Sequence, residues 1–349
     1  MTDLSFYKGK RVFITGHTGF KGSWLCHFLH LLGAEVYGYA LPPADDAPLY
    51  NILDTDGFVH SVYGDVRDLG GLKKAMADAR PDIAIHMAAQ ALVRESYEAP
   101  VATYATNVMG TVHFLEAARA CGVRAIVNVT TDKVYKNDEL GRPFSEEDSF
   151  GGKDPYSNSK ACSELVTYSY GHSFFPPDGV SRLASARAGN VIGGGDFSKN
   201  RLIPDCVRAA LAGQTVVLRS PRSVRPWQHV MEPLTGYLTL AKALYENGAE
   251  YSGGWNFGPA PQDHVTTERV VALFCEKWGG MKYEIVDMGG PHEAGCLKLD
   301  ITKSAERLGF GPRLGLDGAV GLTVEWTKGY ESGEDMAALM LRQIEEYIS

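Results

Sequence analysis

Three glycines spaced three residues apart, Gly16, Gly19 and Gly22, most constrain how this chain can fold. They follow a short β-rich run at 11–15 and precede a segment whose apolar residues repeat at helical spacing until Gly33. A glycine turn between a strand and a helix lets the backbone approach a pyrophosphate closely, and the helix N-terminus then holds that anion. The motif therefore predicts a dinucleotide-binding unit; the alternative is a helix-initiating turn that binds nothing.

The same alternation of strand and helix continues for most of the first half of the chain. The apolar periodicity predicts strands at 35–40, 58–63, 83–87, 125–129 and 181–188, and helices near 70–79, 101–121 and 155–170. Strands that alternate with helices form a parallel sheet with helices on both faces. The predicted fold class is therefore α/β, a Rossmann-like doubly wound parallel sheet.

Beyond Gly189 the alternation breaks down, and a smaller C-terminal substrate domain is expected. The sequence predicts a helix near 203–212, a short strand at 216–219, an apolar helix at 232–246, a last strand at 255–257, then short helices and loops up to a charged terminal helix at 334–348. The helix at 232–246 is apolar enough to return to the first domain. We therefore expect an NAD-binding domain of residues 1–188 plus about 230–258, and a substrate domain of residues 189–229 and 259–349.

Composition limits the classes of partner. The net charge is −8, from 34 Lys and Arg against 42 Asp and Glu, and no block of basic residues stands out, so nucleic acid and anionic membranes are not expected partners. The N-terminus lacks a signal-peptide pattern, and no apolar run approaches the roughly 20 residues of a membrane span. The six cysteines are scattered without a CxxC pair, which favours reduced thiols in a cytoplasmic protein over disulfides or a metal site.

The cofactor candidates come from the ends of the first strands. We expect the loop to hold the pyrophosphate through Gly16, His17, Thr18, Gly19, Phe20, Lys21 and Gly22. The acid that usually binds the ribose should end the second strand, but Ala40 stands there, and Lys21 could instead meet a 2′-phosphate. These residues alone leave NAD and NADP open. Asp65 and Val66 end the third strand and could flank the adenine, or Asp65 could simply cap the next turn.

A hydroxyl, a carboxylate and an amine follow the strand at 125–129 in consecutive positions, as Thr131, Asp132 and Lys133. In an open α/β sheet, ligands bind just outside the carboxyl ends of the strands. These three side chains are therefore predicted to face a bound ligand.

A second catalytic segment begins at Asp154 and Pro155, which are a natural N-cap and first residue of a helix. Tyr156 and Lys160 then lie one turn apart on one helix face. A nearby ammonium and a positively charged nicotinamide ring should lower the pKa of the phenol, so that Tyr156 can act as a base while Thr131 orients the same substrate hydroxyl. The alternative is an exposed tyrosine and lysine on an amphipathic helix.

These motifs together resemble the extended short-chain dehydrogenase/reductase family over about residues 10–260. The resemblance implies a Rossmann domain, a C-terminal sugar-nucleotide domain and a homo-oligomer, a dimer or dimer of dimers, formed through the two long helices at 101–121 and 155–170. It also implies that Asn107 supports its helix rather than contacting substrate. After the fourth strand it adds cofactor candidates at Ala88, Ala89 and Gln90.

The residues after Thr131 distinguish two reactions of that family. An epimerase needs only Thr131, Tyr156 and Lys160 to oxidise the sugar at C4 and return the hydride. Dehydration also needs a base to remove the C5 proton and an acid to protonate the departing C6 hydroxyl, and Asp132 and Lys133 offer both. The family's nucleoside-diphosphate-glucose 4,6-dehydratases carry Thr-Asp-Glu here, so Lys133 is a departure; a lysine that merely pairs with Asp132 is the alternative.

Longer segments resemble the branch of these dehydratases that acts on CDP-glucose. They are the glycine loop with Ser-Trp-Leu after it, the Thr-Asp-Lys sequence, and residues 187–196, 201–205, 225–230 and 292–294. The resemblance implies CDP-glucose as substrate, NAD recycled in each turnover, and a step toward the dideoxysugars of surface polysaccharide such as lipopolysaccharide O-antigen. Candidates for binding the substrate are Gln90, Asn190, Arg201, Arg219, Arg225 and His292, although solvated loop arginines are the alternative for some.

Two other functions stay open on the sequence. The chain could be a dehydratase for another nucleotide sugar or an epimerase of the same family. From a different class, it could be a non-catalytic NAD(P)-sensing protein, although the intact set of Thr131, Tyr156 and Lys160 argues against that.

Overall fold

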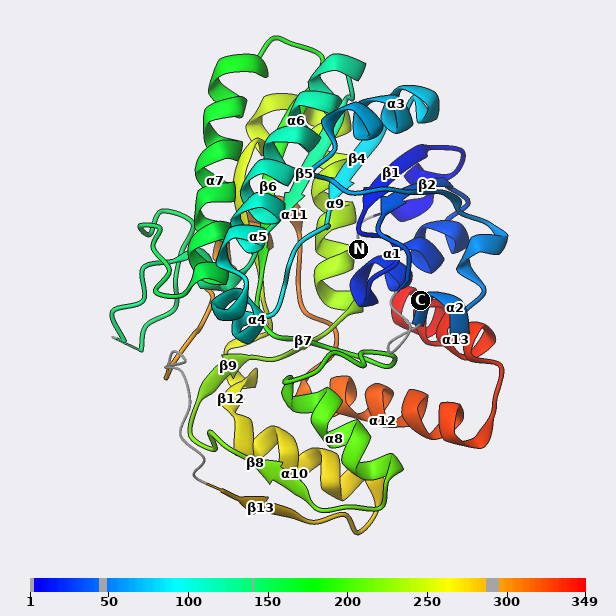
Figure 1. Cartoon of the computed structure of the whole chain (residues 1–349), viewed down its shortest axis with the longest axis vertical. Helices are drawn as coiled ribbons and strands as arrows, with labels where there is room; N and C mark the ends of the chain where they lie inside the picture. The colour runs from blue at the N-terminus through cyan, green and yellow to red at the C-terminus, as the bar shows by residue number, and fades with distance from the viewer. Residues whose placement is uncertain (1–2, 44–48, 140, 287–294) are drawn as a thin grey trace.

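A computed structural model of the chain describes residues 3–43, 49–139, 141–286 and 295–349, and a seven-stranded sheet lies at its centre (Figure 1). All neighbouring strands in this sheet run parallel. Their order is β11 (Gly253–Phe257), β6 (Arg182–Ala188), β5 (Ala125–Val129), β4 (Ile83–His86), β1 (Arg11–Thr15), β2 (Glu35–Ala40) and β3 (His60–Tyr63). Because the chain winds outward from β1 in both directions, the predicted doubly wound α/β fold is confirmed.

Helices cover both faces of the sheet and bury its central strands, while the edge strand β3 stays largely exposed. One face carries α3 (Leu69–Ala79), α6 (Gly110–Cys121) and α7 (Pro155–Phe174), and the other carries α1 (Phe20–Leu31), α9 (Met231–Asn247) and α13 (Met336–Ile348). In strand β1, Phe13 belongs to the core on the first face, while Val12 and Ile14 belong to the core on the second. Because both faces of this strand are buried, its apolar residues are consecutive rather than alternating.

A second, smaller core lies below the sheet in Figure 1. It is built by α8 (Leu202–Leu211), α10 (Thr267–Trp278), α12 (Leu316–Ser332) and the parallel pair of β8 (Val216–Leu218) with β13 (Tyr283–Ile285). Two further short pairs lie between the cores: β7 (Val191–Ile192) with β10 (Gln228–His229), and β9 (Val224–Pro226) with β12 (His264–Thr266).

Short helical segments complete the described chain. They are α2 (Leu49–Ile52), α4 (Val93–Glu98), α5 (Pro100–Tyr104), α11 (Thr302–Leu308), a π-helical turn at Ala105–Met109, and 3₁₀ turns at Leu4–Tyr7, Thr55–Gly57, Asp132–Val134, Gly248–Tyr251 and Pro261–Asp263. Over the described ranges, no helix combines the length and apolarity that crossing a bilayer requires.

The helices differ from the sequence prediction in two places. The single helix expected at 101–121 is α5 and α6 joined by the π-helical turn, which rotates the side chain of Asn107 to a buried position. The region after residue 259 contains the long helices α10 and α12 rather than short ones, because tertiary packing against the smaller core stabilises them. Helix α13 buries Leu339 and Met340 in the same core as α1, so its charged residues form only the outer face.

Candidate active site

The glycine loop has the backbone geometry that close approach of a dinucleotide requires. Gly16 has φ of 77°, and a Cβ placed on it would lie 2.7 Å from the backbone nitrogen of Ala88. A Cβ on Gly22 would lie 2.2 Å from the carbonyl oxygen of Gly16. Helix α1 starts directly after Gly19, and no side chain caps its N-terminus. These residues therefore fit the pyrophosphate of a dinucleotide.

Lys21 points into the protein rather than toward the end of β2. Its Nζ donates to the hydroxyl of Tyr237 at 3.4 Å. Burial, together with the charges of Arg201 and Lys160, lowers the pKa of Lys21 to about 7. The idea that Lys21 meets a 2′-phosphate beside Ala40 is therefore wrong, because the side chain turns to Tyr237 and lies near the candidate catalytic residues.

The other side chains of the loop hold it to the neighbouring strands. His17 is buried with its Nε2 3.0 Å from Ser61 Oγ, and burial lowers its pKa to about 4. Thr18 Oγ1 donates to the carbonyl oxygen of Leu41 at 3.0 Å. Phe20 begins α1 and lies against Gly193 of the smaller domain's first segment. These contacts fix the loop in the absence of the usual acidic residue at Ala40.

Asp65 lies just after β3, and its carboxylate binds a residue of the turn that follows. Its carboxylate accepts from the backbone nitrogen of Arg67 at 2.8 Å and pairs with the guanidinium of the same residue. That is the capping arrangement considered as the alternative, and contact with an adenine stays a prediction. Val66 is buried beside Gly110 of α6.

Asn107 joins the loop after β4 to helix α7. Its Oδ1 accepts from the backbone nitrogen of Gln90 at 2.8 Å, and its Nδ2 donates to the carbonyl oxygen of Gln90 and to Ser159 Oγ, each at 2.9 Å. These bonds agree with the expectation that Asn107 has a supporting role rather than contacting substrate. The backbone nitrogens of Met87 and Ala88 donate to Thr15 Oγ1, directly before the glycine loop. Together these bonds hold the loop at Ala88 and Ala89 close to the glycine loop.

Thr131, Asp132 and Lys133 form one connected cluster at the carboxyl end of β5. Thr131 Oγ1 donates to Asp132 Oδ1 at 3.0 Å and caps the 3₁₀ turn by accepting from the Lys133 nitrogen at 3.4 Å. Lys133 Nζ lies 3.4 Å from the same Asp132 oxygen. The Asp132 side chain is 1% exposed and that of Lys133 is 26% exposed. Asp132 Oδ2 is buried and accepts no hydrogen bond from the described residues.

Tyr156 and Lys160 face this cluster from the first turns of α7. Asp154 caps the helix by accepting from the Ser157 nitrogen at 2.9 Å, as predicted. Lys160 Nζ donates to the carbonyl oxygen of Val129 at 3.0 Å, and burial lowers its pKa to about 8. The side chains of both segments therefore meet at one point on the edge of the sheet.

The protein's own groups raise the pKa of Tyr156, and the lowering expected from a positively charged nicotinamide ring stays a prediction. Burial raises the pKa of this phenol, while a hydrogen bond with Thr131 and the charge of Arg201 act in the lowering direction without overcoming burial. The protein's own groups therefore keep Tyr156 neutral.

The arginines expected to bind substrate differ in burial. Arg201 begins α8, pairs with Asp196 at 3.4 Å and acts electrostatically on Tyr156. Arg225 is buried in β9, and its Nη1 donates to the carbonyl oxygen of Val224 at 2.9 Å. Arg219 directly follows β8 and is exposed.

Three remaining positions complete the set. Asn190 lies between β6 and β7 with a buried Oδ1 that accepts no hydrogen bond from the described residues. Gln90 donates through Nε2 to the carbonyl oxygen of Leu92 at 2.9 Å, and its Oε1 is likewise buried. His292 lies outside the described residues.

His264 is a site residue that the sequence analysis missed. It lies on β12, next to the strand of Arg225, and its Nε2 is buried without a hydrogen-bond partner among the described residues. Burial and the charge of Lys298 lower the pKa of His264, whereas a backbone hydrogen bond at Pro261 and the charges of Asp263 and Asp132 act in the opposite direction. No local pattern could have found it, because β12 reaches the site only by pairing with β9.

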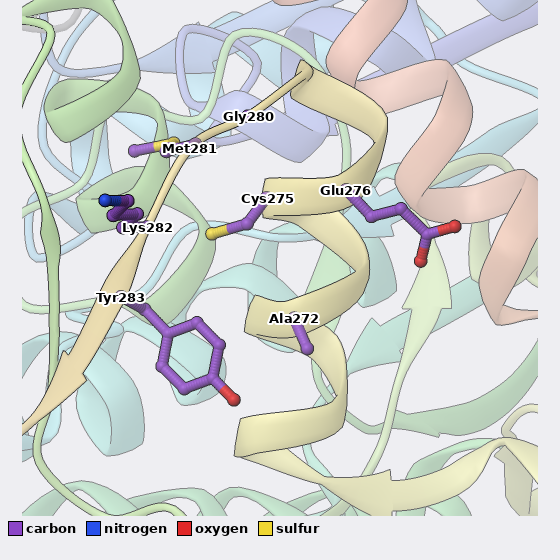
Figure 2. Close-up of a pocket in the computed structure, with 7 residues that line it drawn as sticks. All are labelled: Ala272, Cys275, Glu276, Gly280, Met281, Lys282 and Tyr283. Carbon is purple, nitrogen blue, oxygen red and sulfur yellow. The ribbon is translucent and has the colours of Figure 1, made fainter.

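A separate hollow of about 420 Å³ lies on the smaller core between α10 and β13 (Figure 2). It is lined by Ala272, Cys275, Glu276, Gly280, Met281, Lys282 and Tyr283. None of these residues belongs to the cluster at the end of β5, and burial raises the pKa of the Cys275 thiol, which disfavours a reactive thiolate. The hollow is therefore separate from the candidate catalytic cluster at the carboxyl edge of the large sheet.

Residues 12–252 match the family model described as the NAD dependent epimerase/dehydratase family. The chain belongs to this family. The residues of the glycine loop and Ala40 left NAD and NADP open. Because the family is NAD dependent, the cofactor is NAD. The match covers the glycine loop and six of the seven strands of the large sheet, and it ends just before β11.

Two curated relatives are 4,6-dehydratases. The CDP-glucose 4,6-dehydratase of Salmonella typhimurium is 48% identical, and the alignment covers 100% of this chain and 99% of that protein. The dTDP-glucose 4,6-dehydratase of Streptomyces antibioticus is 30% identical over 90% of this chain and 91% of that protein.

Solved structures share the fold. The dTDP-glucose 4,6-dehydratase DesIV of Streptomyces venezuelae, solved with NAD bound, superposes with a TM-score of 0.77 at 24% identity, covering 93% of this chain and 98% of that one. The UDP-glucose 4-epimerase of Thermus thermophilus in complex with NAD gives a TM-score of 0.78 at 27% identity, covering 91% and 99%.

We predict that Gly22→Ala weakens NAD binding at least about tenfold, because its methyl group would displace the Gly16 carbonyl. Fluorescence titration with NAD measures the dissociation constant. Gly171→Ala on α7 is the control, since a Cβ there meets no atom within 4 Å and NAD affinity should not change. Equal affinities for the two variants would contradict the assignment of the loop.

Proposed function

We propose that this chain is a CDP-glucose 4,6-dehydratase, which converts CDP-D-glucose to CDP-4-dehydro-6-deoxy-D-glucose. The observation that carries the proposal is the pair of Asp132 and Lys133, in contact with each other and directly beside Thr131. A simple epimerase has no use for an additional acid and base at this place. The curated relative at 48% identity over the whole chain supports the choice of CDP-glucose.

The first half of the reaction uses the residues of α7 and Thr131. When bound, NAD accepts a hydride from C4 of the sugar and later returns it to C6. With the positive charge of a bound nicotinamide ring beside it, the pKa of Tyr156 would fall, so that its phenolate removes the proton of the C4 hydroxyl while Thr131 orients that hydroxyl. Lys160 holds the end of β5 through the Val129 carbonyl and supplies the positive charge beside the phenol. The glycine loop and the loop at Ala88 would hold the cofactor.

Asp132 and Lys133 supply the acid and the base of the elimination. A proton that moves from the Lys133 ammonium to Asp132, across their 3.4 Å contact, leaves an amine and a carboxylic acid side by side. The amine removes the C5 proton, the acid protonates the C6 hydroxyl, and the C6–O bond breaks as water leaves. Lys133 afterwards returns its proton to C5.

The proton balance closes through Thr131. The departing water takes a proton from Asp132, and the C4 hydroxyl gives one to Tyr156. Thr131 hydrogen-bonds Tyr156 and donates to Asp132 Oδ1 at 3.0 Å, so it offers a path from the phenol to the carboxylate. The sugar loses one water in total, and the side chains return to their starting protonation states.

We assign substrate binding to the region between the two cores. Arg201 and Arg225 are placed for the diphosphate, and Asn190 and His264 carry buried polar atoms that a substrate could satisfy. On this basis residues 1–188 with about 230–258 form the NAD domain, and 189–229 with 259–349 form the nucleotide-sugar domain, with α13 packed back onto the first.

The proposed function predicts which nucleotide sugar is consumed. With NAD added, CDP-glucose should give a 4-keto-6-deoxy product with a higher kcat/KM than dTDP-, UDP- or GDP-glucose, and in deuterated water the product should carry deuterium at C5. Mass spectrometry measures both. Tyr156→Phe should abolish turnover while nucleotide binding persists. Formation of a C4 epimer, or no product from CDP-glucose, would contradict the proposal.

Lys133→Met should separate oxidation from elimination. The methionine keeps the volume but removes the amine, so we expect C4 oxidation to continue and deuterium uptake at C5 to fall at least about 100-fold. Lys136→Met is the matched control, because Lys136 is 65% exposed and pairs only with Asp138 on the surface. Normal C5 exchange in Lys133→Met would rule out this residue as the base.

We also propose a cytoplasmic homodimer formed through α4, α5 and α7. Large apolar side chains are exposed together on these helices and the π-helical turn: Tyr97, Val101, Tyr104, Met109, Leu165 and Tyr168. Such a patch is larger than scattered apolar residues explain, and α5 already packs along α7, so a second copy could extend the same helix packing.

Val101→Glu should convert the dimer to a monomer, because it introduces a charge at a side chain that is 82% exposed in this patch. Sedimentation velocity measures the mass. Val180→Glu is the control: Val180 is 74% exposed but lies outside these helices. If the wild-type protein is a tetramer and Val101→Glu reduces it only to a dimer, the assembly is a dimer of dimers. An unchanged mass in Val101→Glu would contradict this interface.

A further inference from the structure

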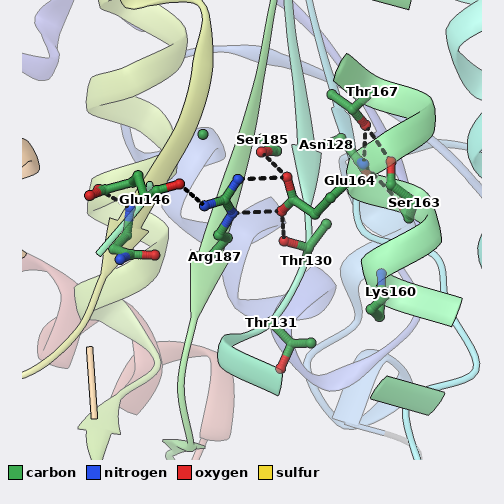
Figure 3. Close-up of polar contacts among 12 residues, drawn as sticks. Asn128, Thr130, Thr131, Glu146, Lys160, Ser163, Glu164, Thr167, Ser185 and Arg187 are labelled. Carbon is green, nitrogen blue, oxygen red and sulfur yellow. Dashed lines mark hydrogen bonds and ion pairs between the residues drawn. The ribbon is translucent and has the colours of Figure 1, made fainter. Parts of the chain in front are cut away.

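A buried ion pair lies directly behind the catalytic residues, where Glu164 of α7 meets Arg187 of β6 (Figure 3). Arg187 Nε donates to Glu164 Oε1 and Nη2 donates to Oε2, each at 3.0 Å, and the two side chains are 5% and 2% exposed. Glu164 follows Lys160 by one helical turn. Ser185 Oγ also donates to Glu164 Oε2, at 2.6 Å, so the carboxylate ties α7 to β6 at two points.

The same pair holds both flanks of the segment 131–134, which carries the proposed acid and base. On one side, the hydroxyl of Thr130 donates to Glu164 Oε1. On the other side, Arg187 Nη1 donates to the hydroxyl of Tyr135 at 2.8 Å. The ion pair therefore links both ends of this segment to the helix of Tyr156 and Lys160, and the Tyr135 hydroxyl also donates to Asn256 Oδ1 at 2.6 Å.

Stability alone does not explain this arrangement. A buried ion pair is commonly no more stabilising than apolar residues of the same volume, although removing one partner is strongly unfavourable. A second polar layer already joins β5 to α7, because Asn128 Nδ2 donates to Ser163 Oγ at 2.9 Å and to Thr167 Oγ1 at 2.7 Å. That layer has no bond to segment 131–134 among the described residues, whereas the ion pair holds both of its ends.

We propose that Glu164 and Arg187 are positioning residues that set the distance between the oxidation site on α7 and the elimination site on segment 131–134. This proposal rests on the dehydratase function proposed above. One sugar must reach Tyr156 with its C4 hydroxyl and Asp132 and Lys133 with its C5 and C6 groups. A displacement of about 1 Å between the two sites can slow a step up to roughly 100-fold.

Tyr135→Phe tests the proposal, because it removes the hydroxyl that accepts from Arg187 and donates to Asn256 Oδ1 at 2.6 Å, and leaves α7 untouched. We expect C4 oxidation within about threefold of wild type and product formation slowed roughly 10- to 100-fold, so that the near-ultraviolet absorbance of reduced nicotinamide accumulates in a single turnover. The KM for the nucleotide sugar should change little. Thr130→Val, on the opposite flank, should give the same pattern.

Two matched controls lose a buried hydroxyl elsewhere. Tyr7→Phe removes a hydroxyl that donates to the Leu238 carbonyl at 2.6 Å, and Thr167→Val removes one from the Asn128 layer. Both should have a lowered melting temperature but a wild-type ratio of oxidation to elimination. The proposal is overturned if the controls show the same imbalance, or if Tyr135→Phe keeps that ratio at its wild-type value.

A measurement without substrate separates this proposal from the proposed function. Amide hydrogen exchange in segment 131–134 should quicken in Tyr135→Phe and Thr130→Val and not in the two controls, while the first turns of α7 stay protected. If the wild-type protein forms no product from CDP-glucose, the proposed function fails whatever the exchange result. Unchanged exchange in both test variants overturns the positioning role on its own.

Discussion

Parallel hydrogen bonding across the whole sheet is the constraint on which the site depends. Because every neighbouring pair of the seven strands is parallel, the carboxyl ends of β1, β4, β5 and β6 emerge at one edge. The glycine loop, the loop held by Asn107 and the Thr131–Lys133 cluster follow those ends. Residues far apart in the sequence thus meet without any of their loops crossing the core.

Burial then sets the electrostatics of that edge. The chain is acidic overall, with a net charge of −8, yet the charges that act on one another at the site are Lys21, Lys133, Lys160 and Arg201 against Asp132. Desolvation lowers the pKa of Lys21 and of Lys160 and raises that of Tyr156. An anionic dinucleotide and a nucleotide sugar would supply the negative charge that such a cluster lacks.

Two kinds of polar contact give the site its rigidity. The π-helical turn presents Asn107 to both the loop after β4 and helix α7, a geometry that a regular helix would not offer. The ion pair of Glu164 and Arg187 joins α7 to β6 and to both flanks of the acid–base segment. Each contact bridges elements that carry different parts of the proposed reaction.

The sequence by itself predicted the alternation of strands and helices in the first half of the chain, the glycine loop and the N-cap at Asp154, because spacing and local backbone preference specify these features. The catalytic role of Thr131–Lys133 and of Tyr156 and Lys160 stays a prediction. Only the tertiary structure decided the direction of Lys21, the raised pKa of Tyr156, the place of His264 and the pairing of Glu164 with Arg187. These depend on which distant segments pack together and on how much water they exclude, and neither quantity is encoded in the spacing of a single motif.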